Sequence, residues 1–225
     1  MPLTELHIPL PTGQATVSVA YERPAGPTAT LVVAHGAGAG MDHPFLTGFT
    51  AALNGLGVAT LRFNFPYREA GRRFPDRPPA AIATWRAVMA TAAGEAARHG
   101  DTGPVWAAGK SFGGRMASMA VAEGMPAAGL VYLGYPLHAP GKPEKLRDEH
   151  LYGLTVPMLF LQGSRDTFAT PPILEDVVGR IGPNAVLRWV DGGDHSFAVA
   201  GRKRSAEEIG AGLAAPVAEF IARSA

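Results

Sequence analysis

The chain of 225 residues contains no cysteine. Without a thiol, the protein can form no disulfide framework, no zinc–thiolate site and no thiolate nucleophile. Histidine pairs at the H-x-x-x-H or H-E-x-x-H spacing, which mark metal-binding helices, are also missing from the sequence. We therefore expect no metal and no cofactor, and any nucleophile should be an oxygen.

Net charge is low as well, because 20 basic and 19 acidic residues leave +1 at pH 7. Such a balance builds no long-range positive field to attract nucleic acid or an anionic membrane. No apolar run reaches the roughly 18 residues of a membrane span, and the first residues lack the pattern of a secretory signal peptide. We therefore expect a cytoplasmic protein that binds neither nucleic acid nor membranes.

The composition predicts a folded domain. Hydrophobic residues form 47% of the chain and charged residues 17%, which supplies ample material for a packed core and excludes intrinsic disorder. The sequence shows no linker and no internal repeat. At roughly 150 residues per domain, we expect a single domain that spans residues 1–225.

Apolar strand patterns alternate with helical patterns along the chain. We predict strands at 15–22, 31–34, 58–63, 105–108, 130–133, 158–161 and 186–190, and helices at 43–56, 79–97, 112–122, 172–181 and 207–222. Strands separated by helices imply right-handed crossovers. The expected fold class is therefore α/β, a mostly parallel sheet with helices on both faces.

A glycine-flanked serine lies between a predicted strand and a predicted helix. Gly109–Gly113, with Ser111 at its centre, matches the G-x-S-x-G nucleophile elbow, a sharp turn that exposes a serine hydroxyl at the end of a sheet. The glycines suit a strained nucleophile and close strand–helix packing. A glycine-rich turn capped by serine is the alternative interpretation. We expect the Lys110 side chain to lie over this turn at the surface.

A serine hydroxyl needs a base, usually a histidine oriented by a carboxylate. His195 lies in the loop 192–197, directly after the last predicted strand. Loops at the carboxyl ends of parallel strands are where such sheets assemble their sites. His195 is therefore the candidate base, whereas His138 and His150, on a proline-rich connection, are interpreted as surface or capping residues.

Asp166 is the candidate orienting acid, because it lies in a tight turn just beyond the predicted strand 158–161. Asp191 and Asp194 are so close to His195 in sequence that their side chains would struggle to reach Nδ1 while Nε2 faces Ser111. A purely turn-forming role is the alternative for Asp166.

Acyl transfer also requires donors for the developing oxyanion. The loop 35–40, His-Gly-Ala-Gly-Ala-Gly, follows the predicted strand 31–34. The backbone N–H groups of Ala37, with Gly38 as a second option, and of Phe112 are the candidate oxyanion hole. The loop lacks the Lys-Ser/Thr ending of a phosphate-binding P-loop and the glycine spacing of a dinucleotide fingerprint. His35 is expected to shape the loop by hydrogen bonding.

Ser111, Asp166 and His195, in this order after a His-Gly loop, resemble the α/β-hydrolase superfamily across nearly the whole chain. The loops 35–45 and 109–115 are most similar to the dienelactone-hydrolase-like group, and within it to a branch related to testis-expressed hydrolase-like proteins. The resemblance implies a serine hydrolase with a minimal lid or none. Dienelactone hydrolases themselves use a cysteine nucleophile, where this chain has Ser111.

We therefore expect hydrolysis of a small carboxylic ester or related acyl bond, on a small-molecule acyl substrate. Thioester, amide and perhydrolytic reactions remain open, because a triad leaves the leaving group undefined. A catalytically silent scaffold or interaction protein is the alternative. Residues 134–157 are too few and too polar to form a helical cap, which favours short acyl chains. Phe112, Tyr135 and Phe197 are the expected pocket aromatics.

Overall fold

An eight-stranded sheet forms the centre of the computed structural model, which describes residues 4–9 and 16–224. The strands lie in the order β1-β2-β4-β3-β5-β6-β7-β8. β1 pairs antiparallel with β2 and β2 pairs antiparallel with β4, whereas the other pairings are parallel. The strands are β1 Thr4–Pro9, β2 Thr16–Glu22, β3 Ala29–Ala34, β4 Val58–Phe63, β5 Val105–Lys110, β6 Leu130–Leu133, β7 Met158–Gly163 and β8 Ala185–Val190.

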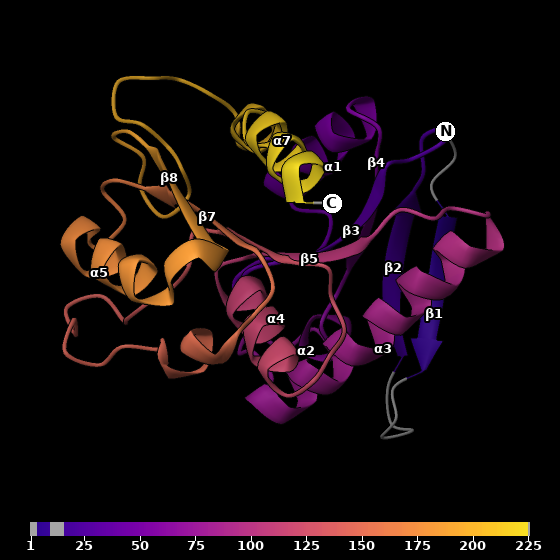
Figure 1. The fold of residues 1–225 in the computed structure, drawn as a ribbon, viewed down its shortest axis with the longest axis horizontal. Coiled ribbons are helices and arrows are strands. Elements are labelled where there is room, and N and C mark those ends of the chain that lie inside the picture. Colours follow the sequence, from indigo (N-terminus) through magenta and orange to yellow (C-terminus); the bar gives the residue numbers. More distant parts are fainter. Residues whose placement is uncertain (1–3, 10–15, 225) are drawn as a thin grey trace.

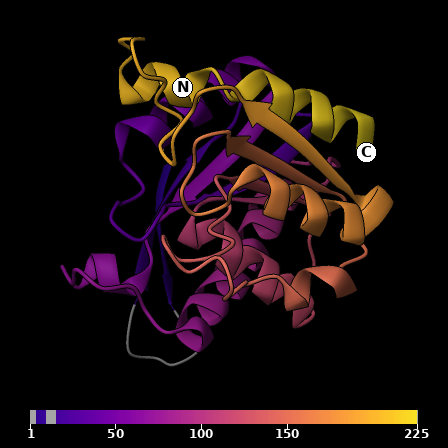
Figure 2. The ribbon, with the colours of Figure 1, turned by 90° about the vertical axis from the view of Figure 1, so that its left-hand side faces the viewer.

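Helices cover both faces of this sheet. α1 and α7 lie on one face, and α3 and α4 lie on the other (Figure 1). Figure 2, turned by 90°, shows the sheet between the two layers. The helices are α1 Pro44–Gly55, α2 Pro66–Glu69, α3 Pro78–Arg98, α4 Phe112–Ala122, α5 Pro171–Ile181, α6 Ala206–Ala211 and α7 Ala214–Ser224, with 3-10 helices η1 Glu149–Gly153 and η2 Gly182–Asn184. Within the described ranges, no helix is both long and apolar enough to cross a membrane.

Each face of the sheet has its own hydrophobic core. Successive side chains of a strand point to opposite faces. Val32 of β3 therefore lies in the core beneath α3 and α4, and its neighbour Val33 lies in the core beneath α1 and α7. All of β3 is buried, as expected for a central parallel strand. The predicted α/β fold class is confirmed.

The C-terminal helix that the sequence predicts over 207–222 consists of two helices, α6 and α7. α6 begins with a capping box formed by Ser205 and Glu208. In one continuous helix, the ring of Pro216 would clash with the Gly212 carbonyl and leave it without an N–H partner. Pro216 lies instead in the first turn of α7, where no intrahelical N–H is needed. The prediction of a single helix is therefore wrong.

The first strand is absent from the prediction. β1 pairs antiparallel with β2, with Thr4 opposite Tyr21. A short strand at the edge of a sheet carries a weak hydrophobic pattern, so its pairing depends on the neighbouring strand more than on its own residues.

The connection between β6 and β7, residues 134–157, forms no cap over the sheet. Its only regular element in the described chain is η1, which packs against α4. Leu137, Leu151 and Leu154 of this connection are buried in the core on the α4 side. The expected fold with a minimal lid is therefore confirmed, and the loops at the carboxyl ends of the strands stay uncovered by this segment.

Candidate active site

Ser111 occupies a sharp corner between β5 and α4. Its backbone has φ 48° and ψ −113°, and it shares a positive φ with only one other non-glycine residue of the described chain, Phe197. Neighbouring glycines allow the corner to form. A Cβ on Gly109 would lie 2.2 Å from the Gly114 nitrogen, and a Cβ on Gly113 would lie 2.6 Å from the His35 carbonyl oxygen. The corner therefore requires glycine on both sides of the serine.

The structure brings the three candidate catalytic side chains together from loops that follow three strands. His195 Nε2 lies 2.9 Å from Ser111 Oγ, and His195 Nδ1 lies 2.6 Å from Asp166 Oδ2. The Asp166 side chain is fully buried, while 23% of the His195 side chain remains exposed. The imidazole therefore connects a buried carboxylate to a hydroxyl at the edge of the sheet.

Fixed donors hold the Asp166 carboxylate in place. Gln162 Nε2 donates to Oδ2 at 2.6 Å, and the Phe168 N–H donates to Oδ1 at 2.8 Å. The Phe168 ring stacks on the imidazole of His195, with 4.2 Å between ring centroids. Asp166 and His195 are thus both oriented by residues of β7 and of the loop that follows it.

The two aspartates nearest to His195 in sequence do not contact its imidazole. Asp194 Oδ1 accepts the N–H groups of Ser196 at 2.8 Å and Ala198 at 2.9 Å. Asp191 Oδ1 accepts the Ser164 hydroxyl at 3.3 Å. Both carboxylates therefore shape the β8–α6 loop.

The candidate oxyanion donors lie on the two loops beside Ser111. Ala37 and Ser111 line the same cavity. Phe112 is the first residue of α4, so its N–H has no acceptor within the helix. The positive end of the α4 dipole points to the same corner. This arrangement suits stabilisation of a negatively charged oxygen next to the serine.

His35 holds the loop that carries Ala37. Its Nε2 accepts the Phe65 N–H at 3.1 Å, so Nδ1 carries the proton and donates to the Gly36 carbonyl at 2.8 Å. Burial lowers the pKa of His35 to about 4, which keeps the ring neutral. The Tyr67 hydroxyl donates to the Ala37 carbonyl at 2.8 Å. His35 is therefore a structural histidine with both ring nitrogens occupied.

A cavity of about 590 Å³ opens beside Ser111 and His195. Its apolar lining includes Phe45 and Leu46 of α1 and Ile209 of α6. Phe45 and Leu46 lie a few residues beyond the His-Gly loop 35–40, so their nearness to the site could be expected from the sequence. Ile209 reaches the cavity only because α6 packs against α1, which no local pattern reveals.

The expected pocket aromatics do not line this cavity. Phe112 packs edge-on against Phe65. Tyr135 is buried and donates its hydroxyl to the Arg147 carbonyl at 2.7 Å. Phe197 stacks on Phe45 in the core. All three aromatics therefore contribute to packing behind the site.

Lys110 also differs from expectation. The residue is partly buried, and its Nζ donates to the His195 carbonyl at 2.6 Å. The expected surface position is wrong, because the β8–α6 loop folds over the end of β5 and covers the side chain.

A second serine–histidine pair lies beneath η1. His150 Nε2 lies 2.8 Å from Ser118 Oγ. Ser118 is fully buried and bonds to the Arg115 carbonyl within its own helix. Burial lowers the pKa of His150 to about 4. The pair joins η1 to α4 and offers no hydroxyl that a substrate could reach.

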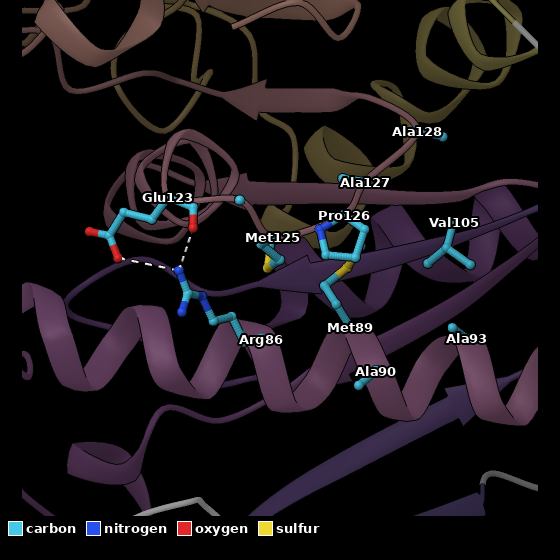
Figure 3. Close-up of a pocket in the computed structure, with 11 residues that line it drawn as sticks. Arg86, Met89, Ala90, Ala93, Val105, Glu123, Met125, Pro126, Ala127 and Ala128 are labelled. Carbon is cyan, nitrogen blue, oxygen red and sulfur yellow. Dashed lines mark hydrogen bonds and ion pairs between the residues drawn. The ribbon is translucent and has the colours of Figure 1, made fainter. Parts of the chain in front are cut away.

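Another hollow, of about 640 Å³, lies between α3 and the chain from Glu123 to Ala128 (Figure 3). Met89 and Met125 are among its apolar lining residues, and Arg86 donates to Glu123 at its edge (Figure 3). Neither serine nor histidine occurs among the described residues that line it. The hollow therefore carries no candidate catalytic group.

Known proteins share this fold. A family model for the α/β-hydrolase domain matches residues 27–222, and the chain belongs to this family. An α/β serine hydrolase without a lid from Xanthomonas campestris is 21% identical, covers 99% of this chain and 96% of its own, and has a TM-score of 0.75.

Two further solved structures are similar over their full length. A dienelactone hydrolase from Anabaena variabilis is 18% identical over 99% of both chains, with a TM-score of 0.70. An esterase domain of a Rhodothermus marinus protein is 15% identical over 98% of this chain and 100% of its own, with a TM-score of 0.71. At such identities, the similarity shows the fold alone.

Proposed function

We propose that this protein is a serine hydrolase that cleaves a small carboxylic ester or related acyl bond through Ser111, His195 and Asp166. The observation that carries the proposal is the continuous contact from the Ser111 hydroxyl through the imidazole to the buried Asp166 carboxylate. The strained backbone of Ser111 supports it, because strain of this kind is typical of nucleophile elbows.

The proton positions follow from the contacts. His195 Nδ1–H donates a hydrogen bond to Asp166, so Nε2 of the neutral ring has a free lone pair facing Ser111. Nε2 takes the hydroxyl proton as Ser111 Oγ attacks the acyl carbon. Asp166 then stabilises the imidazolium that forms. The carboxylate thus fixes the tautomer that the first step requires.

The rest of the reaction uses the two backbone donors. The N–H groups of Ala37 and Phe112 stabilise the tetrahedral oxyanion. His195 returns its proton to the leaving alcohol as the C–O bond breaks, which leaves an acyl group on Ser111. A water molecule then loses its proton to His195 and attacks the ester, releasing the acid and restoring the serine.

The cavity supports a small substrate. Its walls are mostly apolar, with Phe45, Leu46 and Ile209 around the space next to Ser111. In this fold the β6–β7 connection does not extend over it. Each buried methylene contributes about 0.8 kcal/mol, so the cleft should favour short acyl chains and gain little from longer ones.

Within the superfamily, we place the chain with the dienelactone-hydrolase-like group and its branch related to testis-expressed hydrolase-like proteins. The support is the loops 35–45 and 109–115. Ser111 at the nucleophile position argues against dienelactone itself as substrate. Thioesters, amides and perhydrolysis use the same triad. A cytoplasmic location is part of the same proposal.

A fluorophosphonate probe tests the proposal, because only an activated serine reacts with it at neutral pH. We expect labelling at one residue, Ser111, and hydrolysis of short p-nitrophenyl esters by the same preparation. Ser111→Ala should remove both, while Ser118→Ala, the matched control in α4, should keep the labelling if it folds. If the folded wild-type protein takes up no label, the proposal is overturned in favour of a catalytically silent scaffold.

A further inference from the structure

Lys110 lies against the backbone of the candidate base. It is the last residue of β5 and directly precedes Ser111. Its Nζ donates to the His195 carbonyl at 2.6 Å and lies 5.6 Å from the centroid of the Phe197 ring. Gly134 leaves the space for it, since a Cβ there would lie 3.2 Å from Nζ. The ammonium therefore lies between β5, the end of β6 and the β8–α6 loop, and Lys110 also lines the cavity beside Ser111.

The loop that carries His195 is also held by hydrogen bonds to the loop after β7, where the Arg165 N–H donates to the Gly193 carbonyl at 2.8 Å and the Gly192 N–H donates to Ser164 Oγ at 2.8 Å. Further contacts lie within the loop itself. Asp194 accepts two N–H groups within the loop, and Gly193 forms an isolated bridge with Val199. Apart from the bond between the imidazole and Ser111, the Lys110–His195 bond is the only described hydrogen bond from this loop to the β5–α4 corner. One side chain therefore connects the base to the segment that carries the nucleophile.

This position is unfavourable for a charged group. Burial lowers the pKa of Lys110 to about 8, although the negative charges of Asp166 and Asp194 act in the opposite direction. A lysine in the unfolded chain keeps a pKa near 10.4. At pH 7 the protonated lysine therefore favours the unfolded state. A variant with an uncharged side chain of similar length at this position should be at least as stable as the wild-type protein.

We propose that Lys110 is a positioning residue, whose ammonium holds the His195 backbone so that the imidazole stays aligned between Ser111 and Asp166. This inference rests on the proposed function. A charged hydrogen bond is stronger than a neutral one, so the ammonium fixes the loop more firmly than the amine would. Lys110 touches no reacting atom and acts through His195.

The charge of Lys110 should appear in the pH profile. The titratable groups that face it are Asp166 on the loop after β7, and Asp194 and His195 on the loop after β8. The parts of the β3 and β6 loops next to it are Gly36 and Gly134, which carry no charge. As the ammonium loses its proton above pH 8, the bond to His195 weakens and kcat should fall.

The test compares Lys110→Met with Lys142→Met, whose lysine is exposed on the β6–β7 connection. For Lys110→Met we expect kcat to fall about 10-fold or more, KM to change little, and the melting temperature at pH 7 to stay equal or rise. The decline in kcat above pH 8 should disappear. Lys142→Met should match wild type in every measurement.

Unchanged kcat in Lys110→Met, or a loss of kcat together with a lower melting temperature, would overturn the inference. If the variant does not fold, the wild-type profile decides: a kcat that stays level from pH 7.5 to about 9.5, across the pKa near 8, contradicts it. Fluorophosphonate labelling separates the two proposals. Wild-type protein that labels while Lys110→Met keeps full activity rejects only the role of Lys110.

Discussion

At the scale of single residues, environment decides what each histidine does. His35 is buried and His150 is half-buried, and removal from water lowers the pKa of each to about 4. Both rings are engaged in bonds that hold the backbone or a neighbouring helix. His195 instead lines a cavity and has a carboxylate on one side and a hydroxyl on the other. Histidine therefore has a structural role at positions 35 and 150, and at position 195 it is placed for acid–base chemistry.

The first prediction at this scale concerns Asp166. In Asp166→Asn, the amide can donate to Nδ1, which favours the tautomer with its proton on Nε2 and removes the acceptor for the Ser111 proton. We expect kcat to fall roughly 10³-fold or more with an unchanged circular dichroism spectrum. Asp191→Asn is the control, because Asp191 is exposed and its described side-chain hydrogen bond is to Ser164, not to His195. Normal activity in Asp166→Asn with loss in Asp191→Asn would show that the acid is misassigned.

At the scale of elements, the wall of the cavity depends on how closely α1 and α6 approach. A Cβ on Gly210 of α6 would lie 1.9 Å from the Phe45 carbonyl oxygen, and a Cβ on Gly48 of α1 would lie 2.3 Å from the Glu207 carbonyl oxygen. The helices therefore meet backbone to backbone at two points. This contact places Ile209 and Leu46 in the lining of the same cavity.

Gly210→Ala should separate these helices, since backbone atoms cannot move aside as a flexible side chain can. We expect a loss of about 1–3 kcal/mol in the free energy of unfolding, because the added methyl overpacks the contact. KM for short esters should rise as the wall moves. Gly94→Ala in α3 is the matched control, with open space around its Cβ position, and should gain about 0.5–1 kcal/mol. Equal stabilities for the two variants in urea unfolding would contradict this account.

At the scale of the whole molecule, the site is an open cleft at one edge of the sheet. The β6–β7 connection packs down against α4 and leaves the wall of the cavity to α1 and α6. A substrate therefore loses contact with water only over the part that enters a cavity of about 590 Å³.

Selectivity for chain length should reflect this architecture. Across p-nitrophenyl esters from acetate to palmitate, we expect kcat/KM to rise over the short chains, by about fourfold for each buried methylene, and then to level off. Ile209→Ala, which enlarges the cavity, should move the plateau to longer chains. A continuous rise up to palmitate in the wild type would reveal an apolar tunnel and contradict the expectation.

Local patterns in the sequence were enough to predict the alternation of strands and helices along the chain and the corner at Ser111. A glycine at each side of a serine, between a strand and a helix, permits few conformations. Asp166 and His195 could be proposed as partners because the carboxyl ends of parallel strands meet at one edge of the sheet. The structure indeed brings these side chains within hydrogen-bond distance, while their catalytic roles remain a proposal.

Only the tertiary structure decided which side chains surround them. Ile209 reaches the cavity because α6 returns to α1, and Lys110 is half-buried because the β8–α6 loop lies against it. The pairing of β1 with β2 likewise depends on a partner strand. These features arise from contacts between segments far apart in the chain, whose energies depend on the assembled neighbours. Periodicity and turn residues report local preferences, so they do not predict contacts between distant segments.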